Sequence, residues 1–189
     1  MMMEYKAIRA IYDDETIRVY QAYCHRIADE AVKLGTFGSQ FSLNRMTWIK
    51  PSFLWMMYRA GWGTKENQER ILAIDIKRSA FDYLVRNAVE SSYHEQSDIS
   101  REAWKQQIQN SDIRVQFDPE RDIYGNALSY RSIQIGIRGD AVRQYVNDWI
   151  VHVDDITHYV TELRTRKQSG EDISCLLPEE HIYHISEVK

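Results

Sequence analysis

A run of six apolar residues places the strongest constraint on the fold of this chain. Residues 53–58, FLWMMY, lie between Pro51, which suits the first turn of a helix, and Gly61, which suits its end. A helix without a polar face is stable in a water-soluble protein only when neighbouring elements bury it on all sides. We therefore expect a core helix with other elements packed around it.

The other elements follow strand and helix patterns in no strict alternation. Alternating β-branched and aromatic residues predict strands over 6–12, 16–23, 70–78, 113–118 and 132–138. Helical spacing of apolar residues predicts helices over 25–35, 80–90, 100–110 and 141–153. The expected N-caps of the last three helices are Ser79, Ser100 and Asp140. An edge strand is expected to return near 179–185. This order favours an α+β fold with a mixed sheet, in which residues 1–160 form a single domain and 161–189 a C-terminal extension packed on it.

Charge and cysteine content narrow the classes of function. The chain carries 24 lysines and arginines against 28 aspartates and glutamates. Its net charge of −4 excludes a wholly basic nucleic-acid binder but not a local basic groove. Cys24 and Cys175 are too far apart to predict a disulfide framework. Because the sequence shows no secretion signal and no apolar run of membrane-spanning length, we expect a cytoplasmic protein without membrane contact.

Several motifs for cofactors and catalysis do not occur in the sequence. It contains no G-x-G-x-x-G, no P-loop pattern and no G-x-S-x-G. His181 and His184 stand in an extended stretch that places them on opposite faces, so we expect no metal site. A Rossmann dinucleotide site and a P-loop nucleotide site are thereby excluded.

The approach to the apolar helix is the first candidate site. Arg45, Trp48 and Lys50 precede the helix, and Trp48 and Lys50 lie on the same side of an extended segment. Cations and an indole beside a helix N-terminus, with backbone N–H groups near Ser52, are typical of a seat for an anion or a nucleotide. The alternative interpretation is that these aromatic residues only extend the core.

Two further segments carry polar side chains that could form a site. Residues 117–136 place Asp118 in a loop marked by proline and glycine, and Arg131 and Gln134 at the start of a strand. The alternative there is a hairpin with surface ion pairs. In the 16–23 strand, Gln21 faces opposite to Tyr20 and is either a donor in a pocket or an edge residue.

Four strings of the sequence carry a resemblance to a known family. They are IRAIYDDETIRVYQAY, RMTWIKPSFLWMMYRAGWGTK, FDPERD and YRSIQIGIRG. Together they are similar to an uncharacterised domain-of-unknown-function family of bacteria and fungi, over most of residues 5–160. This resemblance does not name a reaction.

A more distant resemblance suggests one. VYQAY followed by a helix that ends in Gly and Phe resembles the opening of proteins with the ADP-ribosyltransferase fold. RMTWIKPSFLWMMY is loosely similar to a segment of the branch that modifies nucleic acids. The resemblance implies a split, mostly antiparallel sheet with NAD in the cleft, and cleavage of the nicotinamide–ribose bond through an oxocarbenium-like transition state. The acceptor would be a nucleic acid or a protein. The late catalytic glutamate of that superfamily has no match in this sequence.

The site residues that this resemblance implies divide into two groups. The catalytic residues are Gln21, Asp118 and Gln134. The residues that bind the cofactor are Arg9, Tyr20, Arg45, Trp48, Lys50, Ser52 and Arg131.

Two other hypotheses remain open from the sequence. In the first, the protein is a non-catalytic module for nucleic acid or a modified base, built from residues 45–65. Its stacking residues would be Trp48, Tyr58 and Trp62, and its phosphate contacts Arg45, Lys50, Arg59 and Lys65. In the second, the protein is a scaffold whose aromatic residues all belong to the core.

Overall fold

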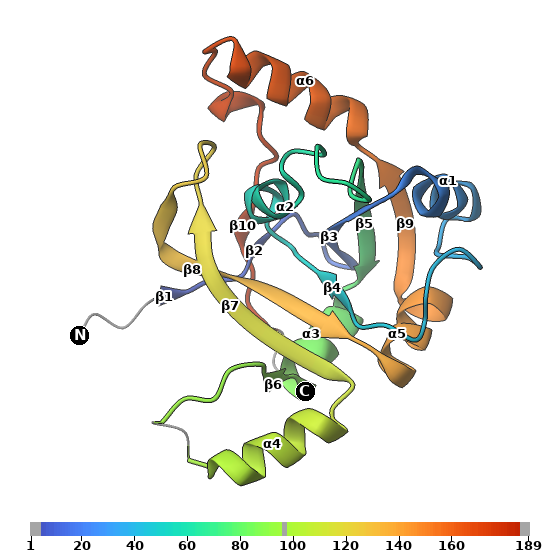
Figure 1. The fold of residues 1–189 in the computed structure, drawn as a ribbon, viewed down its shortest axis with the longest axis vertical. Helices are drawn as coiled ribbons and strands as arrows, with labels where there is room; N and C mark the ends of the chain where they lie inside the picture. Colours follow the sequence, from blue (N-terminus) through green and yellow to red (C-terminus); the bar gives the residue numbers. More distant parts are fainter. Residues whose placement is uncertain (1–4, 96–97, 186–189) are drawn as a thin grey trace.

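Two main sheets, a small two-stranded sheet and a set of surrounding helices form an α+β fold in the computed structural model, which describes residues 5–95 and 98–185 (Figure 1). One sheet is antiparallel and has the strand order β3 (Thr16–Tyr23), β5 (Arg70–Lys77), β9 (Ile150–Asp155). The predicted strands at 16–23 and 70–78 are confirmed. The chain forms one domain with mixed sheets, as the pattern of elements predicts.

The second sheet is built on a long hairpin of β7 (Ile113–Arg121) and β8 (Ala127–Ile137). On β8 lie the antiparallel β4 (Thr47–Ile49) and the parallel β1 (Tyr5–Lys6), and β6 (Val89–Glu90) runs parallel to β7. A small separate pair joins β2 (Arg9–Ala10) to β10 (His181–Ile182), so the C-terminal segment returns as a strand, as expected. The expected strand over 6–12 is divided between β1 and β2, which pair with different partners.

Helices cover the sheets, and the core consists of two clusters that meet at β3. The helices are α1 (His25–Leu34), α2 (Phe53–Ala60), α3 (Arg78–Asn87), α4 (Arg101–Asn110), α5 (Gly139–Gln144) and α6 (Thr157–Gln168), with a short 3-10 turn at Ser174–Leu176. Alternate residues of β3 enter different clusters, because Ile17 and Val19 pack in one while Tyr20 packs with α2 in the other. Both faces of the sheet therefore bury side chains at β3 and β5, whereas β9 is largely exposed.

The apolar helix is confirmed, with two differences from the expectation. Helix α2 begins at Phe53 with Ser52 as its N-cap, so Pro51 lies before the helix and not in its first turn. Gly61 ends it in the left-handed conformation. Five of its residues are buried hydrophobic side chains, but Tyr58 is 41% exposed, so the helix is not enclosed on all sides.

Other predicted elements differ from the structure at their ends. Asp140 does not cap the helix predicted after it, because α5 begins at Gly139 with Arg138 as its N-cap and ends at Gln144. Residues Tyr145–Trp149 form a π-helical turn and the chain then becomes β9, because β5 offers it a pairing edge. Ser79 does not cap α3, which begins at Arg78 directly after β5. Ser100 caps α4 as predicted, with its hydroxyl accepting from the N–H of Ala103.

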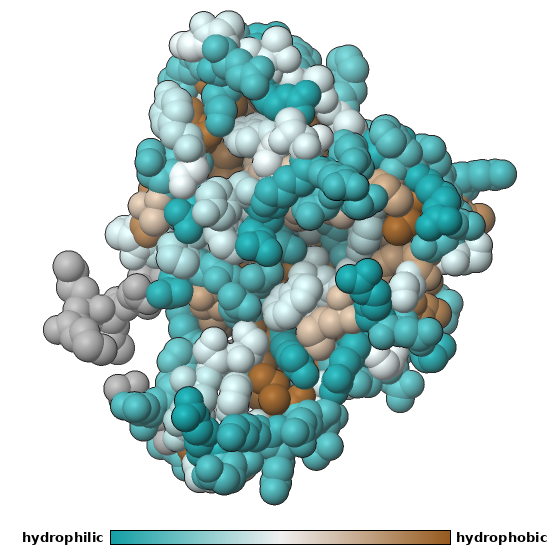
Figure 2. All heavy atoms as spheres, in the orientation of Figure 1, coloured by the Kyte–Doolittle hydropathy of each residue, from teal (hydrophilic) through white to brown (hydrophobic). Residues whose placement is uncertain are grey.

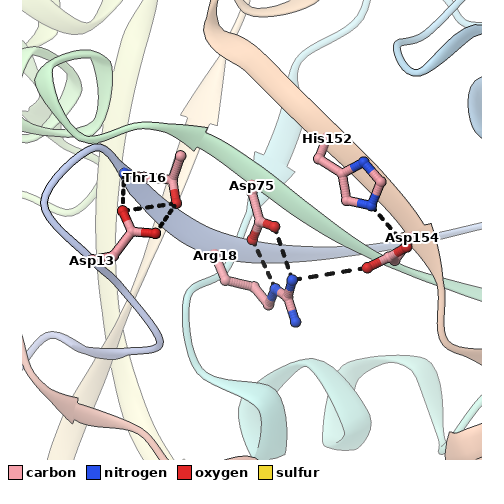
Figure 3. A network of polar contacts seen from close by, with 6 residues as sticks. All are labelled: Asp13, Thr16, Arg18, Asp75, His152 and Asp154. Atoms are coloured by element: carbon pink, nitrogen blue, oxygen red, sulfur yellow. Dashed lines mark hydrogen bonds and ion pairs between the residues drawn. The ribbon is translucent and has the colours of Figure 1, made fainter.

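A row of polar side chains links the three strands of the antiparallel sheet (Figure 3). The Arg18 guanidinium on β3 donates two hydrogen bonds of 2.8 Å to the carboxylate of Asp75 on β5. It also lies 3.9 Å from Asp154 on β9, which contacts His152. Asp13 accepts from the backbone of Thr16 at the start of β3. These side chains bind one another, so we assign the row a structural role.

No helix in the described part of the chain is long and apolar enough to cross a membrane.

Candidate functional site

A groove lies where the two sheets meet. The junction is a bridge between Tyr20 on β3 and Lys50, just after β4, whose carbonyl accepts a 2.7 Å hydrogen bond from the Tyr20 N–H. Two adjoining hollows, of about 550 and about 250 Å³, lie at this junction beside the end of β3. They share five residues, Ala22, Tyr23, Met46, Thr47 and Gln68. We call the two together the junction groove. The face shown in Figure 2 is hollowed near its centre, with hydrophilic residues around the hollow.

The lining of the junction groove is positively charged. Arg26 and Arg45 line the larger hollow, and Lys50, Arg59 and Lys65 line the smaller one. Neither lining contains an aspartate or a glutamate. Within residues 5–95 and 98–185, none of these five cations forms an ion pair with an acidic side chain. In a chain with a net charge of −4, this is a local concentration of unneutralised positive charge.

Lys50 differs from the other four cations because it is buried. The residue is only 7% exposed to solvent, and its Nζ donates a 3.2 Å hydrogen bond to the carbonyl of Trp48. The pKa of its amine is lowered to about 7, mainly by burial and also by the nearby Arg59, while attraction by Asp118 opposes both effects. The Lys50 amine is therefore close to its titration point at neutral pH.

Gln21 forms part of a buried hydrogen-bond network in the wall of the groove. Its Nε2 donates to the Thr47 hydroxyl at 2.7 Å and to the Tyr23 hydroxyl at 2.9 Å, and its Oε1 accepts from the Tyr145 hydroxyl at 2.8 Å. Burial raises the pKa of both tyrosines, so both stay protonated. Because both Nε2 hydrogens of Gln21 are occupied, the network orients Tyr23 and Thr47, which line both hollows.

The structure brings only some of the predicted site residues together. Gln21, Trp48 and Lys50 line the smaller hollow, and Arg45 lines the larger one. Asp118 and Gln134 line neither. Asp118 lies on β7 and not in a loop, and its Oδ2 accepts a 2.6 Å hydrogen bond from Gln134 Nε2 on β8. The connection of this pair with the groove is electrostatic: the charge of Asp118 attracts the Lys50 amine.

The other predicted residues lie outside the groove, each for a local reason. Tyr20 points from the opposite face of β3 into the core, where its ring packs on Phe53. Ser52 is buried, and its hydroxyl accepts from the Trp55 N–H as the cap of α2. Arg9 on β2 donates to the carbonyl of Glu180. Arg131 donates to the carbonyl of Phe117 and lines a separate hollow at the β6 end of its sheet.

The aromatic residues of segment 45–65 do not gather in one place. Trp48 lines the junction groove, whereas Tyr58 and Trp62 line a different hollow of about 250 Å³ between α2, the tip of the β7–β8 hairpin and α6. Near this hollow the Arg121 guanidinium lies 4.3 Å from the centre of the Tyr58 ring, and Nζ of Lys167, a lining residue, lies 4.9 Å from that of Trp62. We call it the aromatic hollow.

Arg26 and Thr47 are groove residues that sequence reasoning missed. Arg26 lies in the first turn of α1, directly after the end of β3, and Thr47 opens β4. The only sequence signal for Arg26 is its place immediately after a predicted strand that carries candidate residues. In the described part of the chain, no group of three or more His, Cys, Asp or Glu side chains is placed to hold a metal ion.

Comparison with known proteins identifies the family but not the reaction. The family described as Domain of unknown function (DUF4291) matches residues 7–183, which is nearly the whole chain. No curated protein matches this sequence. The resemblance to a domain-of-unknown-function family is confirmed, and the chain belongs to the DUF4291 family.

Proposed function

We propose that the junction groove binds NAD and that the protein is an ADP-ribosyltransferase-like enzyme acting on a nucleic acid or a protein acceptor. The observation that carries this proposal is the charge of the groove: Arg26, Arg45, Arg59 and Lys65 line it together with the titrating amine of Lys50, and no carboxylate does, although the whole chain is acidic. A dinucleotide diphosphate needs such a lining, because phosphates are held by arginine and lysine side chains.

Different residues of the groove suit different parts of NAD. Arg45, Arg59 and Lys65 are the groups for the pyrophosphate, and Trp48 offers an aromatic surface to one of the two rings of NAD. In the reaction, the bond between ribose C1 and the nicotinamide nitrogen breaks, and nicotinamide leaves with the electron pair. A nucleophile of the acceptor then forms the new bond to C1 and loses its proton to solvent. Positive charge that develops on the ribose is stabilised by a carboxylate. Asp118 lines neither hollow but lies near enough to attract Lys50, and it is the carboxylate that we propose for this role.

The test is direct measurement of nicotinamide release. The full chain is incubated with NAD, and nicotinamide is separated by chromatography and counted against a blank without protein. Release that is lost in the Asp118→Asn variant supports the proposal. Saturable NAD binding without any release refutes the catalytic part and leaves a nucleotide-binding site. Absence of both binding and release refutes the whole proposal.

A second candidate function rests on the aromatic hollow. Tyr58 and Trp62 both line this hollow, and each has a cation near its ring. Proteins that bind single-stranded nucleic acids combine such aromatic side chains, on which bases stack, with cations that contact the phosphates. Trp48 takes no part in this arrangement. Binding of a fluorescent single-stranded oligonucleotide, weakening steeply with salt and lost in Trp62→Ala, favours this function. Binding that is equal in the variant refutes the role of the hollow.

A further inference from the structure

Lys50 combines burial with access to a cavity. The side chain is among the buried polar residues of the protein, yet it lines the smaller hollow of the junction groove. Its hydrogen-bond acceptor is a neutral carbonyl, that of Trp48, and not a carboxylate. A structural lysine at such a depth is normally paired with an acidic side chain, because an isolated buried charge is costly. The burial of Lys50, its access to the hollow and its neutral hydrogen-bond partner are typical of a reactive lysine amine.

We propose that the Lys50 amine is a nucleophile that forms an imine with an aldehyde or ketone that carries a phosphate or carboxylate group. The nitrogen attacks the carbonyl carbon, a C=N bond forms in place of the C=O bond, and the carbonyl oxygen leaves as water with two protons, both of them from the amine nitrogen. The step involves no oxidation and no co-reactant. It goes beyond the proposed function, because it needs neither NAD nor an acceptor.

The surroundings of Lys50 keep its amine reactive. Only a neutral amine attacks a carbonyl, and desolvated lysines next to another cation are the ones that do so in proteins. Burial first, and Arg59 on α2 second, bring the pKa of Lys50 to about 7, while Asp118 on β7 opposes them. At about pH 7.5 such an amine is mostly neutral, whereas an ordinary lysine with a pKa of ≈ 10.4 is neutral in about one molecule per thousand. The hydrogen bond to the Trp48 carbonyl uses an N–H and leaves the lone pair free.

The same hollow determines which carbonyl compounds are accepted. Arg59 and Lys65 line it beside Lys50, and no acidic side chain does. An anionic group on the substrate is therefore attracted to the two exposed cations while its carbonyl reaches the buried amine. The volume of about 250 Å³ suits a small molecule. The substrate class is a small aldehyde or ketone with a phosphate or carboxylate.

The experiment uses pyridoxal 5′-phosphate, an aldehyde with a phosphate, as the probe. The full chain is mixed with it at about neutral pH, the imine is reduced with borohydride, and peptide mass spectrometry locates the label. The expected result is that Lys50 is labelled first and at least about tenfold faster than Lys65 or Lys105, in line with its larger neutral fraction. Inorganic phosphate is expected to slow the labelling of Lys50, and pyridoxal without the phosphate to label it more slowly.

Matched variants keep the test decisive. Lys105→Arg changes an exposed lysine on α4, outside the junction groove, and is expected to retain the label on Lys50. Lys50→Arg and Lys50→Met, each checked for folding by circular dichroism, are expected to lose the fast phase. Labelling spread evenly over exposed lysines, or a fast phase that survives in a folded Lys50 variant, overturns the proposal.

Discussion

Replacing Lys50 by methionine removes a buried amine whose charge the folded protein tolerates poorly. The pKa of Lys50 falls from its ordinary 10.5 to about 7 on folding, mainly because of burial. A difference of one in pKa is worth about 1.4 kcal/mol, so the fall corresponds to about 5 kcal/mol when the amine is charged in both states. Below about pH 7 the full cost is present in the wild type, and Lys50→Met lacks it.

The sign of the pH dependence follows from proton binding. Between about pH 7 and 10.5 the unfolded chain holds a proton on Lys50 that the folded protein has released, so wild-type stability rises with pH in this window. The free energy of unfolding of Lys50→Met minus that of the wild type should therefore be largest near pH 6 and fall by several kcal/mol towards about pH 10. Groups that titrate in both proteins cancel in this difference.

The assay is urea denaturation of both proteins in steps of pH, followed by tryptophan fluorescence. Lys65→Met is the control, because Lys65 is an exposed lysine of the same hollow, and its difference from the wild type is expected to stay within about 0.5 kcal/mol at all pH values. A Lys50→Met difference that does not change with pH would mean that Lys50 keeps an ordinary pKa, and the reasoning about its burial would be refuted.

Three further substitutions test other parts of the structure. Tyr145→Phe removes the donor to the buried Gln21 Oε1 and should cost about 1–3 kcal/mol by urea denaturation; a loss under about 0.5 kcal/mol would contradict the network. In Gly136→Ala the new Cβ would lie 2.8 Å from Met46 Sδ and 3.0 Å from the Trp48 ring. We expect a shift of both side chains, seen for Trp48 in the fluorescence spectrum, and a loss of about 1–3 kcal/mol; an unchanged spectrum and stability would contradict this packing. Burial raises the pKa of Glu180 to about 8, so between about pH 4.5 and 8 the folded protein holds a proton that the unfolded chain has lost, and stability falls as pH rises. Glu180→Gln should reduce this fall, and equal pH profiles for the two proteins would contradict it.

Local signals in the sequence predicted much of the fold. Helix α2 is confirmed because its apolar run and its terminal Gly61 depend on neighbouring residues only, and the Ser100 cap of α4 is local in the same way. The turn of the chain into β9 was not predicted. Apolar spacing through Val146 and Trp149 fits a helix, and only pairing with the distant β5 makes the following residues a strand.

The candidate site was predicted less completely, because its geometry depends on contacts between distant residues. The charged approach at Arg45 and Lys50 was recognisable from composition. The burial of Lys50 was not, since it results from the packing of α2 and β7 around β4. The amide of Gln21 is bound by Tyr145, a residue 124 positions later in the chain, and no local pattern indicates such a partner.

Calorimetric titration with NAD tests the central claim, that the cations of the junction groove bind an anionic nucleotide. The wild type at low ionic strength is expected to bind NAD saturably, and more weakly as salt is added. Arg59→Glu combined with Lys65→Glu places two carboxylates in the groove and should abolish binding. Lys105→Glu, the same kind of change on the exposed surface of α4, should leave binding intact. Absence of NAD binding to the wild type, or equal affinity in the groove variant and the control, would contradict the account.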